Sequence, residues 1–379
     1  MSRPVALLLA PIRPDAQGNG LARRAWMWAA TLAARHELRT IVLAPGQWAA
    51  QGRVDVPGTT KIVPVRVSAT RPDWIVADPE LVHALRDALP AEMPDRIVVF
   101  RLYLLDVLAL LPPAWRHRVE LDSDDREARA RLDFARLSFR RLRPRAALRH
   151  LRGALCYIRA ERRAIRQVSS LHLAAEEDAD AVRRLAGPGV RVVATPNRID
   201  GPLVPLRAGG SVLPPRILFV GTLGFLPNED AALWLAEAIA PHLRRLVPDA
   251  QVTVAGLPGS ARLAAALARA GVAYLGAPES LSEAYANAAV AIAPLRGGSG
   301  TKLKVLEAWQ HGLPVVATSH ACRGLGAVPD QDVLRADSAS GLAAACARLL
   351  IDGALAARLA ANGQAQLRRR FHMASPERA

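Results

Sequence analysis

One segment, residues 289–318, constrains the fold more than any other part of the chain. It opens with the apolar run AVAIAPL, which predicts a buried strand, and continues with the turn RGGSG, which is too rich in glycine to pack. A helix is predicted next, with Thr301 as its N-cap, a left-handed residue at Gly312 and Pro314 preventing continuation. Residues 315–318 then predict another buried strand. Strand, glycine turn, helix and strand form the unit of a parallel α/β sheet.

The same segment predicts an anion site. Ligands of parallel sheets bind at the carboxyl ends of the strands, where the N-terminus of a helix carries about half a positive charge. Lys302 and Lys304, two of only three lysines in the chain, lie here, although lysine and arginine total 50 residues. The spacing fits neither a Walker A loop nor a dinucleotide fingerprint. We interpret the site as one for a diphosphate; a surface ion pair of Lys304 with Glu307 is the alternative, and it leaves the glycine turn unexplained.

Strand and helix signals alternate along the rest of the chain, which predicts doubly wound α/β layers, and 379 residues suggest two domains. Residues 196–216 contain five prolines and three glycines without a sustained period and predict a linker. Strands are predicted at residues 4–9, 39–44, 61–67, 96–100, 216–221, 250–255 and 272–276, and helices at 21–35, 79–89, 229–246, 260–270, 280–288, 338–351 and 354–371.

Composition favours a reduced, cytoplasmic setting. Half of the residues are hydrophobic (51%), no signal peptide is recognisable, and no apolar run approaches the roughly 18 residues that would span a bilayer. The three cysteines are scattered and odd in number, without the spacing of metal ligands. No metal or cofactor is expected.

The net charge of +16 is concentrated in residues 134–167, which Pro144 divides into two predicted helices with mixed apolar and basic faces. Three readings remain open: a peripheral contact with an anionic membrane, a solvated helical face, and binding to nucleic acid, which the scarcity of aromatics (4%) makes the least expected. The arginines concerned are Arg136, Arg140, Arg141, Arg143, Arg145, Arg149, Arg152, Arg159, Arg162, Arg163 and Arg166.

The N-terminal half offers candidates for a second ligand. Gly18, Asn19 and Gly20 form a turn between the first strand and helix, and Arg101 ends the strand IVVF. Asp122, with Asp124 and Asp125, follows another strand; a D-x-D metal site is one reading, and helix capping or an acidic group facing a cleft is another. Arg23 and Arg24 either meet an acidic acceptor or form a solvated pair.

Several segments together resemble glycosyltransferase family 4, whose members have the GT-B fold and retain anomeric configuration. The segment GGSGTKLKVLEAWQHGLPVVAT is similar to the donor-site signature of that family, ILFVGTLGFLPNEDAALWL to the first strand, loop and helix of its C-terminal domain, and VVATPNRID to its interdomain segment. The resemblance covers nearly the whole chain and is strongest from about residue 190 to 350. It implies two Rossmann-like doubly wound domains facing a central cleft, with an acceptor-binding domain at 1–200, a donor-binding domain at 201–353 and a terminal helix, 354–379, that crosses back.

The resemblance also implies site residues. Glu307 matches the glutamate that holds the nucleotide ribose, but Ser299 stands where the family has its first glutamate, and the loop after Gly221 lacks the family's cations. We assign catalysis to Lys302, Lys304 and Ser299, with the lysines as diphosphate cations. Acceptor contacts are assigned to Gly18, Asn19, Gly20, Arg101 and Asp122. The other residues expected to bind the donor are Gly221, Gly297, Gly298, Gly300, Thr301 and Leu303.

The hypothesis is a metal-independent, retaining transfer of a sugar from a nucleotide-diphosphate sugar to a cell-envelope polysaccharide or lipid-linked glycan. The expected location is the cytoplasm, peripheral at the inner face of the membrane through residues 136–166. Two alternatives are another enzyme on the same scaffold, such as a nucleotide-sugar epimerase or a phosphorylase, and a non-catalytic protein that binds nucleotide sugars.

Overall fold

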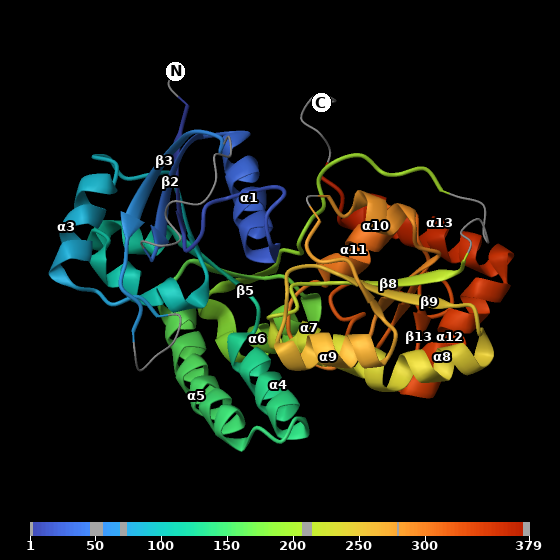
Figure 1. Cartoon of the computed structure of the whole chain (residues 1–379). Coiled ribbons are helices and arrows are strands. Elements are labelled where there is room, and N and C mark those ends of the chain that lie inside the picture. Colours follow the sequence, from blue (N-terminus) through green and yellow to red (C-terminus); the bar gives the residue numbers. More distant parts are fainter. Residues whose placement is uncertain (1–2, 46–55, 69–73, 207–213, 279, 374–379) are drawn as a thin grey trace. The chain divides into compact units, whose positions relative to one another are not determined.

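The computed structural model describes residues 3–45, 56–68, 74–206, 214–278 and 280–373, and the chain divides into two compact units. The first consists of residues 1–132 and 148–197, and the second of residues 133–147 and 198–379. The predicted linker at residues 196–216 lies partly outside the described residues. Each unit has its own hydrophobic core built on a parallel sheet, as the alternation of strand and helix signals predicts (Figure 1).

The sheet of the first unit has seven strands in the order β3-β2-β1-β4-β5-β6-β7, and all of its pairings are parallel. The reversal of order beside β1 marks a doubly wound sheet, in which ligands bind outside the carboxyl ends of the strands. The strands are β1 (Val5–Ala10), β2 (Glu37–Ala44), β3 (Thr59–Pro64), β4 (Arg96–Phe100), β5 (Val119–Asp124), β6 (Ser170–Leu173) and β7 (Arg191–Ala194).

Helices connect these strands. Asn19 caps the first helix by accepting a hydrogen bond from Ala22 N, and Asp78 caps another through Leu81 N, where Pro79 occupies the first turn. The helices are α1 (Gly20–Ala33), α3 (Pro79–Ala88), η1 (Leu102–Leu110), η2 (Pro113–Arg118), α4 (Glu127–Arg140), α5 (Pro144–Gln167), α6 (Glu176–Ala186) and η3 (Gly187–Gly189). Pro144 begins α5 and so separates two helices, as predicted.

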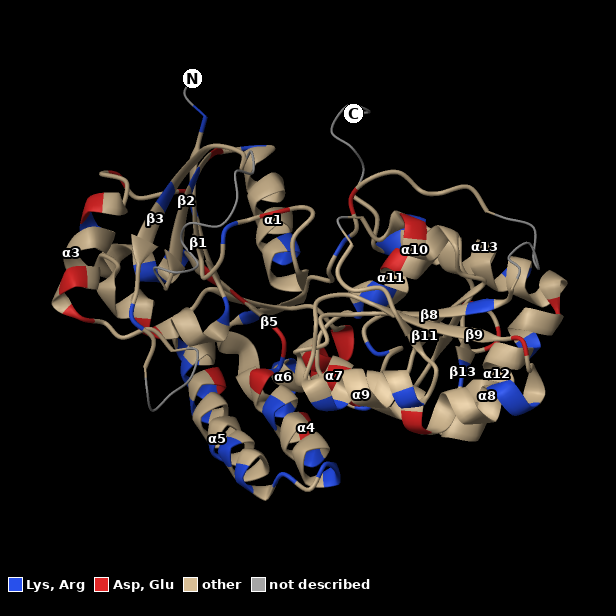
Figure 2. Ribbon diagram, viewed as in Figure 1, with Lys and Arg blue, Asp and Glu red and all other residues tan. Residues whose placement is uncertain are grey.

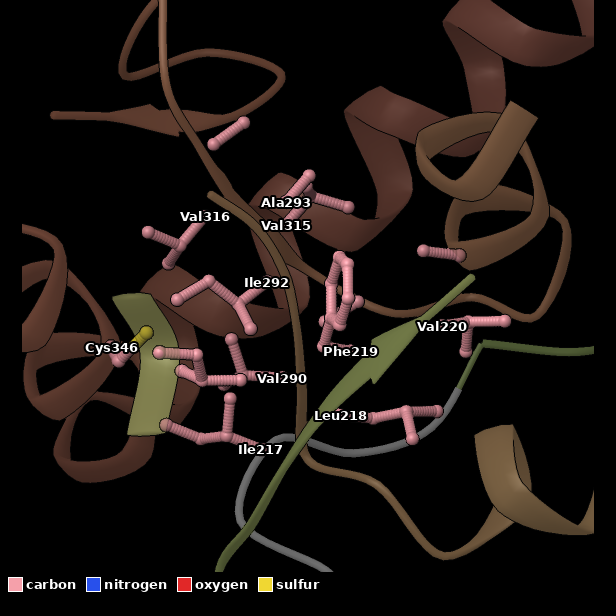
Figure 3. Packing of buried hydrophobic residues seen from close by; sticks show 14 of the residues in the cluster. Ile217, Leu218, Phe219, Val220, Val290, Ile292, Ala293, Val315, Val316 and Cys346 are labelled. Atoms are coloured by element: carbon pink, nitrogen blue, oxygen red, sulfur yellow. The ribbon is translucent and has the colours of Figure 1, made fainter. Parts of the chain in front are cut away.

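The second unit has a six-stranded parallel sheet in the order β10-β9-β8-β11-β12-β13. The strands β8 and β11 are buried almost throughout, which is typical of parallel sheets covered by helices on both faces. Figure 3 shows their side chains, among them Phe219, Val290 and Ile292, packed with Val316 and Cys346 (Figure 3). The strands are β8 (Arg216–Val220), β9 (Gln251–Ala255), β10 (Ala273–Tyr274), β11 (Val290–Ala293), β12 (Val315–Ala317) and β13 (Leu334–Arg335).

The helices of the second unit include one irregularity. Residues 229–246 were predicted as one helix, but a π-turn divides it; Pro241 lacks the N–H that a regular ladder needs there. The helices are α7 (Leu226–Trp234), η4 (Leu235–Ile239), α8 (Ala240–Leu246), α9 (Ala261–Arg269), α10 (Ser282–Ala286), α11 (Leu303–Gln310), α12 (Ala339–Ile351) and α13 (Gly353–Arg370).

The segment 289–318 folds as strand, glycine turn, helix and strand, which confirms its predicted organisation. Gly312 adopts the expected left-handed conformation, with a φ of 67°. The prediction that Thr301 caps the helix is wrong, because α11 begins one residue later with Lys302 at the cap position. An ammonium group has no lone pair to offer, so the Lys302 side chain does not cap the first turn of α11.

None of the helices in the described part of the chain combines the length and the apolar character needed to cross a bilayer.

Candidate functional site

The glycine turn between β11 and α11 depends on glycine at specific positions. Gly298 and Gly300 have φ values of 101° and 70°, which side chains rarely tolerate. A Cβ on Gly297 would lie 2.9 Å from Leu137 Cδ1, so the backbone approaches α4 closely. The carbonyl of Gly298 accepts a hydrogen bond from His320 Nε2 at 2.6 Å. The turn is therefore held in one conformation by groups on both sides.

Lys302 stabilises the turn from within. Its Nζ donates to the carbonyls of Ser299, at 2.7 Å, and Gly300, at 2.8 Å, and the side chain is almost entirely buried. These contacts direct the ammonium toward the loop that precedes α11. Its assignment as a diphosphate cation stays a prediction, and the structure adds a bracing role that sequence spacing did not indicate.

Lys304 is held by residues from other elements. Its Nζ donates to Asn228 Oδ1 at 2.8 Å and lies 5.3 Å from the centre of the Phe219 ring on β8. Burial lowers the pKa of Lys304 to about 8; Glu307 opposes that change and the charge of Lys302 adds to it. A cation kept in such surroundings, in the first turn of α11, suits an anionic ligand.

Glu307 lies one turn further along α11. Its Oε2 accepts a hydrogen bond from Tyr285 Oη at 3.1 Å, and the Tyr285 ring stacks on His311 with centroids 4.5 Å apart. Tyr285 is 2% exposed, so it fixes one carboxylate oxygen of Glu307 from inside the protein. Sequence reasoning missed Tyr285, because its position in α10 gives no sign of a contact with α11.

Ser299 occupies the middle of the glycine turn. Its carbonyl accepts from Lys302, and its Oγ is buried without a hydrogen-bond partner in the described structure. An unsatisfied buried hydroxyl is uncommon and costs stability. This hydroxyl is therefore available to a ligand group at the place where the sequence departs from the family pattern.

An ion cluster anchors the start of the turn. The Arg296 guanidinium forms two hydrogen bonds with Asp230, of 2.8 and 2.9 Å, and stacks over Trp234 at 4.4 Å. Arg141 Nε donates to the same carboxylate at 3.1 Å, and Asp230 is 1% exposed. Two arginines thus share one buried carboxylate, and residues 133–147 contribute to the surroundings of the glycine turn through Arg141 and Leu137.

The loop after β8 contributes backbone rather than charge. A Cβ on Gly221 would lie 2.9 Å from Asn228, and one on Gly256 would lie 2.0 Å from the Gly221 carbonyl oxygen. Asn228 Nδ2 donates to the Thr222 carbonyl at 3.0 Å, which leaves its Oδ1 for Lys304. Asn228 therefore connects the loop after β8 to α11. The Pro-Asn pair in the quoted sequence was the signal that could have identified it.

The structure brings the expected donor-binding residues together at the carboxyl ends of β8, β11 and β12. Gly297, Gly298, Gly300 and Thr301 are buried in the turn, and Leu303 and Glu307 are partly exposed on α11. The expected acceptor residues belong to the first unit.

The structure corrects the assignment of Asp122 to the acceptor. Its carboxylate is 0% exposed; Oδ1 accepts from Arg24 Nη2 and Oδ2 from Arg24 Nε, each at 2.7 Å, and Trp28 Nε1 also donates to Oδ2. Arg24 in turn donates to Asn197 Oδ1 at 2.9 Å. The hypothesis that Asp122 faces an acceptor is therefore wrong, and so is a solvated or acceptor-binding role for Arg24. In the alternative of a D-x-D metal site, Asp122 would be the first ligand, but Arg24 and Trp28 already occupy its carboxylate.

Arg101 belongs to the same ion network. Its Nη1 donates to Asp124 Oδ2 at 2.9 Å and its Nη2 to Glu127, and its side chain is 11% exposed. Arg101 and Asp124 both have positive φ values, 87° and 60°, which is unusual for side chains of this kind. Burial raises the pKa of Asp124 to about 7, against the opposing charges of Arg24 and Arg101. A direct acceptor contact by Arg101 stays a prediction.

The turn before α1 is accessible. Asn19 and Gly20 are exposed, and Asn19 uses its side chain to cap α1. A Cβ on Gly18 would lie 2.7 Å from Ala22 Cβ. These residues lie at the carboxyl end of β1, where a ligand of this unit is expected.

Comparisons with known proteins agree with this geometry. Residues 214–352, a range that includes the glycine turn and α11, match the family model described as glycosyl transferases group 1. No curated protein sequence matches the chain.

Solved structures resemble the whole chain. Sucrose-phosphate synthase from Thermosynechococcus elongatus has a TM-score of 0.72 and 16% identity, covering 98% of this chain and 95% of that one. The Anabaena protein HepE in complex with UDP-glucose has a TM-score of 0.67 and 16% identity, covering 97% and 96%. WaaG, a glycosyltransferase involved in lipopolysaccharide biosynthesis, has a TM-score of 0.59 and 17% identity, covering 96% and 95%.

The fold is GT-B, an α/β architecture with two Rossmann-like doubly wound domains, which confirms the predicted fold class. The match of residues 214–352 to the group 1 model, together with this fold, supports sugar transfer as the activity of the protein.

Proposed function

We propose that the protein transfers a sugar from a nucleotide-diphosphate sugar to an acceptor hydroxyl, with retention of configuration and without a metal. The observation that carries the proposal is the arrangement at the start of α11. There, a glycine turn, the N-terminus of α11 and Lys304, which is held by Asn228, lie within the segment that matches glycosyl transferases group 1. Complexes of the similar Anabaena protein HepE with UDP and UDP-glucose support this kind of donor.

Each group has a proposed task. Lys304 and the amides of residues 300–303 stabilise the charge that develops on the diphosphate as the bond to the anomeric carbon breaks. Lys302 holds the turn and adds positive charge beside it. Glu307, fixed by Tyr285, binds the ribose hydroxyls, and the Ser299 hydroxyl contacts the transferred sugar. The anomeric carbon forms its new bond to the acceptor oxygen, and the departing phosphate takes up the acceptor's proton.

The acceptor we propose is a cell-envelope polysaccharide or a lipid-linked glycan, with the protein at the inner face of the cytoplasmic membrane. The support for this location is the arginine-rich segment of α4 and α5, where basic residues recur at exposed positions. Gly18, Asn19 and Gly20 are the proposed acceptor-side residues, because they are accessible at the carboxyl end of β1.

Replacing Lys304 with Met tests the proposal. A thermal-shift screen of the full chain with UDP-, GDP-, ADP- and dTDP-sugars first identifies the donor, because donor binding raises stability. Release of nucleoside diphosphate is then measured with envelope lipid extracts as acceptor. We expect Lys304→Met to lower kcat by about 100-fold or more, as losses of single charge-stabilising groups do, and to change donor affinity much less.

Lys61→Met is the matched control. Lys61 is the only lysine of the sequence outside the motif, and it lies exposed on β3. Its turnover should equal that of the wild type. An unchanged kcat in Lys304→Met would contradict the role of Lys304. Diphosphate release that does not depend on an acceptor would favour hydrolysis or another reaction on this fold, and donor binding without any turnover would favour a binding protein.

A further inference from the structure

A histidine in the segment after β12 contacts the glycine turn. His320 Nε2 lies 2.6 Å from the Gly298 carbonyl oxygen. A carbonyl oxygen can only accept, so the imidazole carries a hydrogen on Nε2, and the contact selects one tautomer of the neutral ring. Gly298 has a φ of 101°, and glycine has a wider choice of backbone conformations than any other residue. The hydrogen bond therefore restrains a part of the turn that its own sequence leaves free to move.

The segment that carries His320 is itself fixed to the start of the turn. Thr318, which is 2% exposed, donates from Oγ1 to the Leu295 carbonyl, just before the turn begins. The same Oγ1 accepts a hydrogen bond from Ala321 N at 3.1 Å. His320 lies between the two residues that this bond joins, so its backbone has little freedom and its ring is directed by the fold.

The far end of the same segment is held by α13. Gln366, which is 3% exposed, donates from Nε2 to the carbonyls of Leu325, at 3.1 Å, and Gly326, at 3.2 Å. A Cβ on Gly326 would lie 2.0 Å from Arg370 Nη1, so the segment also approaches α13 closely. Residues 318–326 are thus anchored at both ends, and they form a rigid support from which His320 reaches the turn.

We infer that His320 is a positioning residue for the donor, because through Gly298 it holds the glycine turn in the conformation that receives the diphosphate. The inference rests on the proposed function. The basic residues of the motif lie at the start of α11, directly after the turn, and an acidic one lies further along the helix (Figure 2). Backbone amides and a cation stabilise a developing charge only at the correct distance, and a displacement of about 1 Å can cost about 100-fold in rate. His320 acts on that distance without contacting the donor.

Two replacements of His320 separate the hydrogen bond from the bulk of the ring. His320→Leu removes the donor, whereas the side-chain amide of His320→Gln can donate from the place of Nε2. In His320→Leu, we expect hydrogen exchange in residues 297–306 to rise about fivefold, as the loss of one hydrogen bond allows. We also expect kcat to fall about tenfold and KM for the donor to change much less, because the misplaced groups act mainly in the transition state. His320→Gln should stay within about twofold of the wild type in each measurement.

His372→Leu is the matched control. His372 Nε2 lies 2.8 Å from the carbonyl of Gly201, which also has a positive φ, of 90°. A Cβ on Gly201 would lie 3.5 Å from Gln310 Nε2, so this contact is near the other end of α11. His372→Leu should lower the midpoint of denaturant unfolding about as much as His320→Leu does. Exchange in the turn and kcat should equal those of the wild type.

Hydrogen exchange is measured without substrate, so it tests the support of the turn separately from the proposed reaction. If the wild type turns over no donor, the proposed function fails, and exchange alone decides whether His320 holds the turn. Unchanged exchange in His320→Leu, or equal effects of His320→Leu and His372→Leu on the turn, would overturn the inference. So would increased exchange with an unchanged kcat. If His320→Gln behaves as His320→Leu does, the ring rather than its hydrogen bond supports the turn, and the inference is wrong.

Discussion

Lys304 illustrates how one buried contact tunes a charged group. Burial in contact with Asn228 and Phe219 places its pKa at about 8, below the ordinary value for lysine. Because the folded-state pKa is depressed, the fold disfavours the charged form of Lys304. This cost to stability is fully present below about pH 8, where the group is charged in both the folded and the unfolded chain. The contribution of this group to stability therefore rises with pH from about 8 up to the pKa of the unfolded chain. The site keeps a cation at a cost to stability, as functional sites often do.

The pH dependence of activity follows from the same value. We expect kcat/KM for the donor to fall as pH rises through about 8, because the free protein then loses the ammonium of Lys304. Bound diphosphate favours the charged amine, so the corresponding fall in kcat should lie at higher pH. Rate measurements from pH 6 to 10, on the wild type and on Lys304→Arg, check this.

Lys304→Arg is the discriminating variant, since a guanidinium stays protonated across this range. Its kcat/KM should show no fall near pH 8. A fall of the same size at the same pH in both proteins would assign the titration to another group.

The sequence distinguishes the two lysines of the motif only partly. Their scarcity and position beside a glycine turn predict an anion site, and the structure places both lysines beside that turn. Which of them faces a ligand depends on partners that only the folded chain supplies: the neighbouring carbonyls of the turn for Lys302 and the distant Asn228 for Lys304. In the same way, Asp122 looks available in the sequence, and only the fold shows that Arg24 and Trp28, about a hundred positions earlier, enclose it.

At the scale of elements, α11 is positioned by close packing on α13. Gly363 on α13 faces Trp309 on α11, and a Cβ there would lie 2.3 Å from the indole ring, which is 0% exposed. Glycine in a helix interior costs up to about 1 kcal/mol relative to alanine. The chain accepts that cost here because only glycine lets the two helices approach.

Two glycine-to-alanine changes in helix interiors test this packing. Gly363→Ala should destabilise the protein by about 1–3 kcal/mol through overpacking and should weaken donor binding by displacing α11. Gly153→Ala on α5, where the nearest atom to a Cβ is Arg131 Cδ at 3.7 Å, should stabilise it by about 0.5–1 kcal/mol. Denaturant unfolding measures both. A stabilising Gly363→Ala would refute the close approach.

Helices and strands were predictable where the apolar periodicity agrees with the prolines and glycines that begin or end an element. Pro79, Gly312 and Pro144 mark element ends in the sequence and do so in the structure. The π-turn at Leu235–Ile239 and the left-handed conformations of Arg101 and Asp124 were not predictable, since each depends on contacts made after the chain has folded. The positive φ values occur within the buried ion network of the first unit.

At the scale of the whole molecule, two separate cores build two doubly wound sheets, and this architecture follows from the alternation of strand and helix signals. The grouping of residues 133–147 with the second unit does not follow from the sequence. It rests on contacts such as those of Leu137 with Gly297 and Arg141 with Asp230, which join segments about 90 or more positions apart. Composition indicates the charge of this segment but not its partners.

The near-absence of lysine has a chemical consequence for the molecule as a whole. Acylating reagents attack neutral amines, and at pH 8 about half of Lys304 is in that form, compared with under about 1% of an ordinary lysine. Lys61 donates to the Asp87 carbonyl on the surface, and Lys302 is buried in the turn. Peptide mass mapping after brief acylation should therefore find Lys304 modified first among the three lysines, and the correct nucleotide sugar should protect it. In a protein whose positive charge is almost all guanidinium, a simple amine reagent reports on one side chain besides the terminal α-amino group.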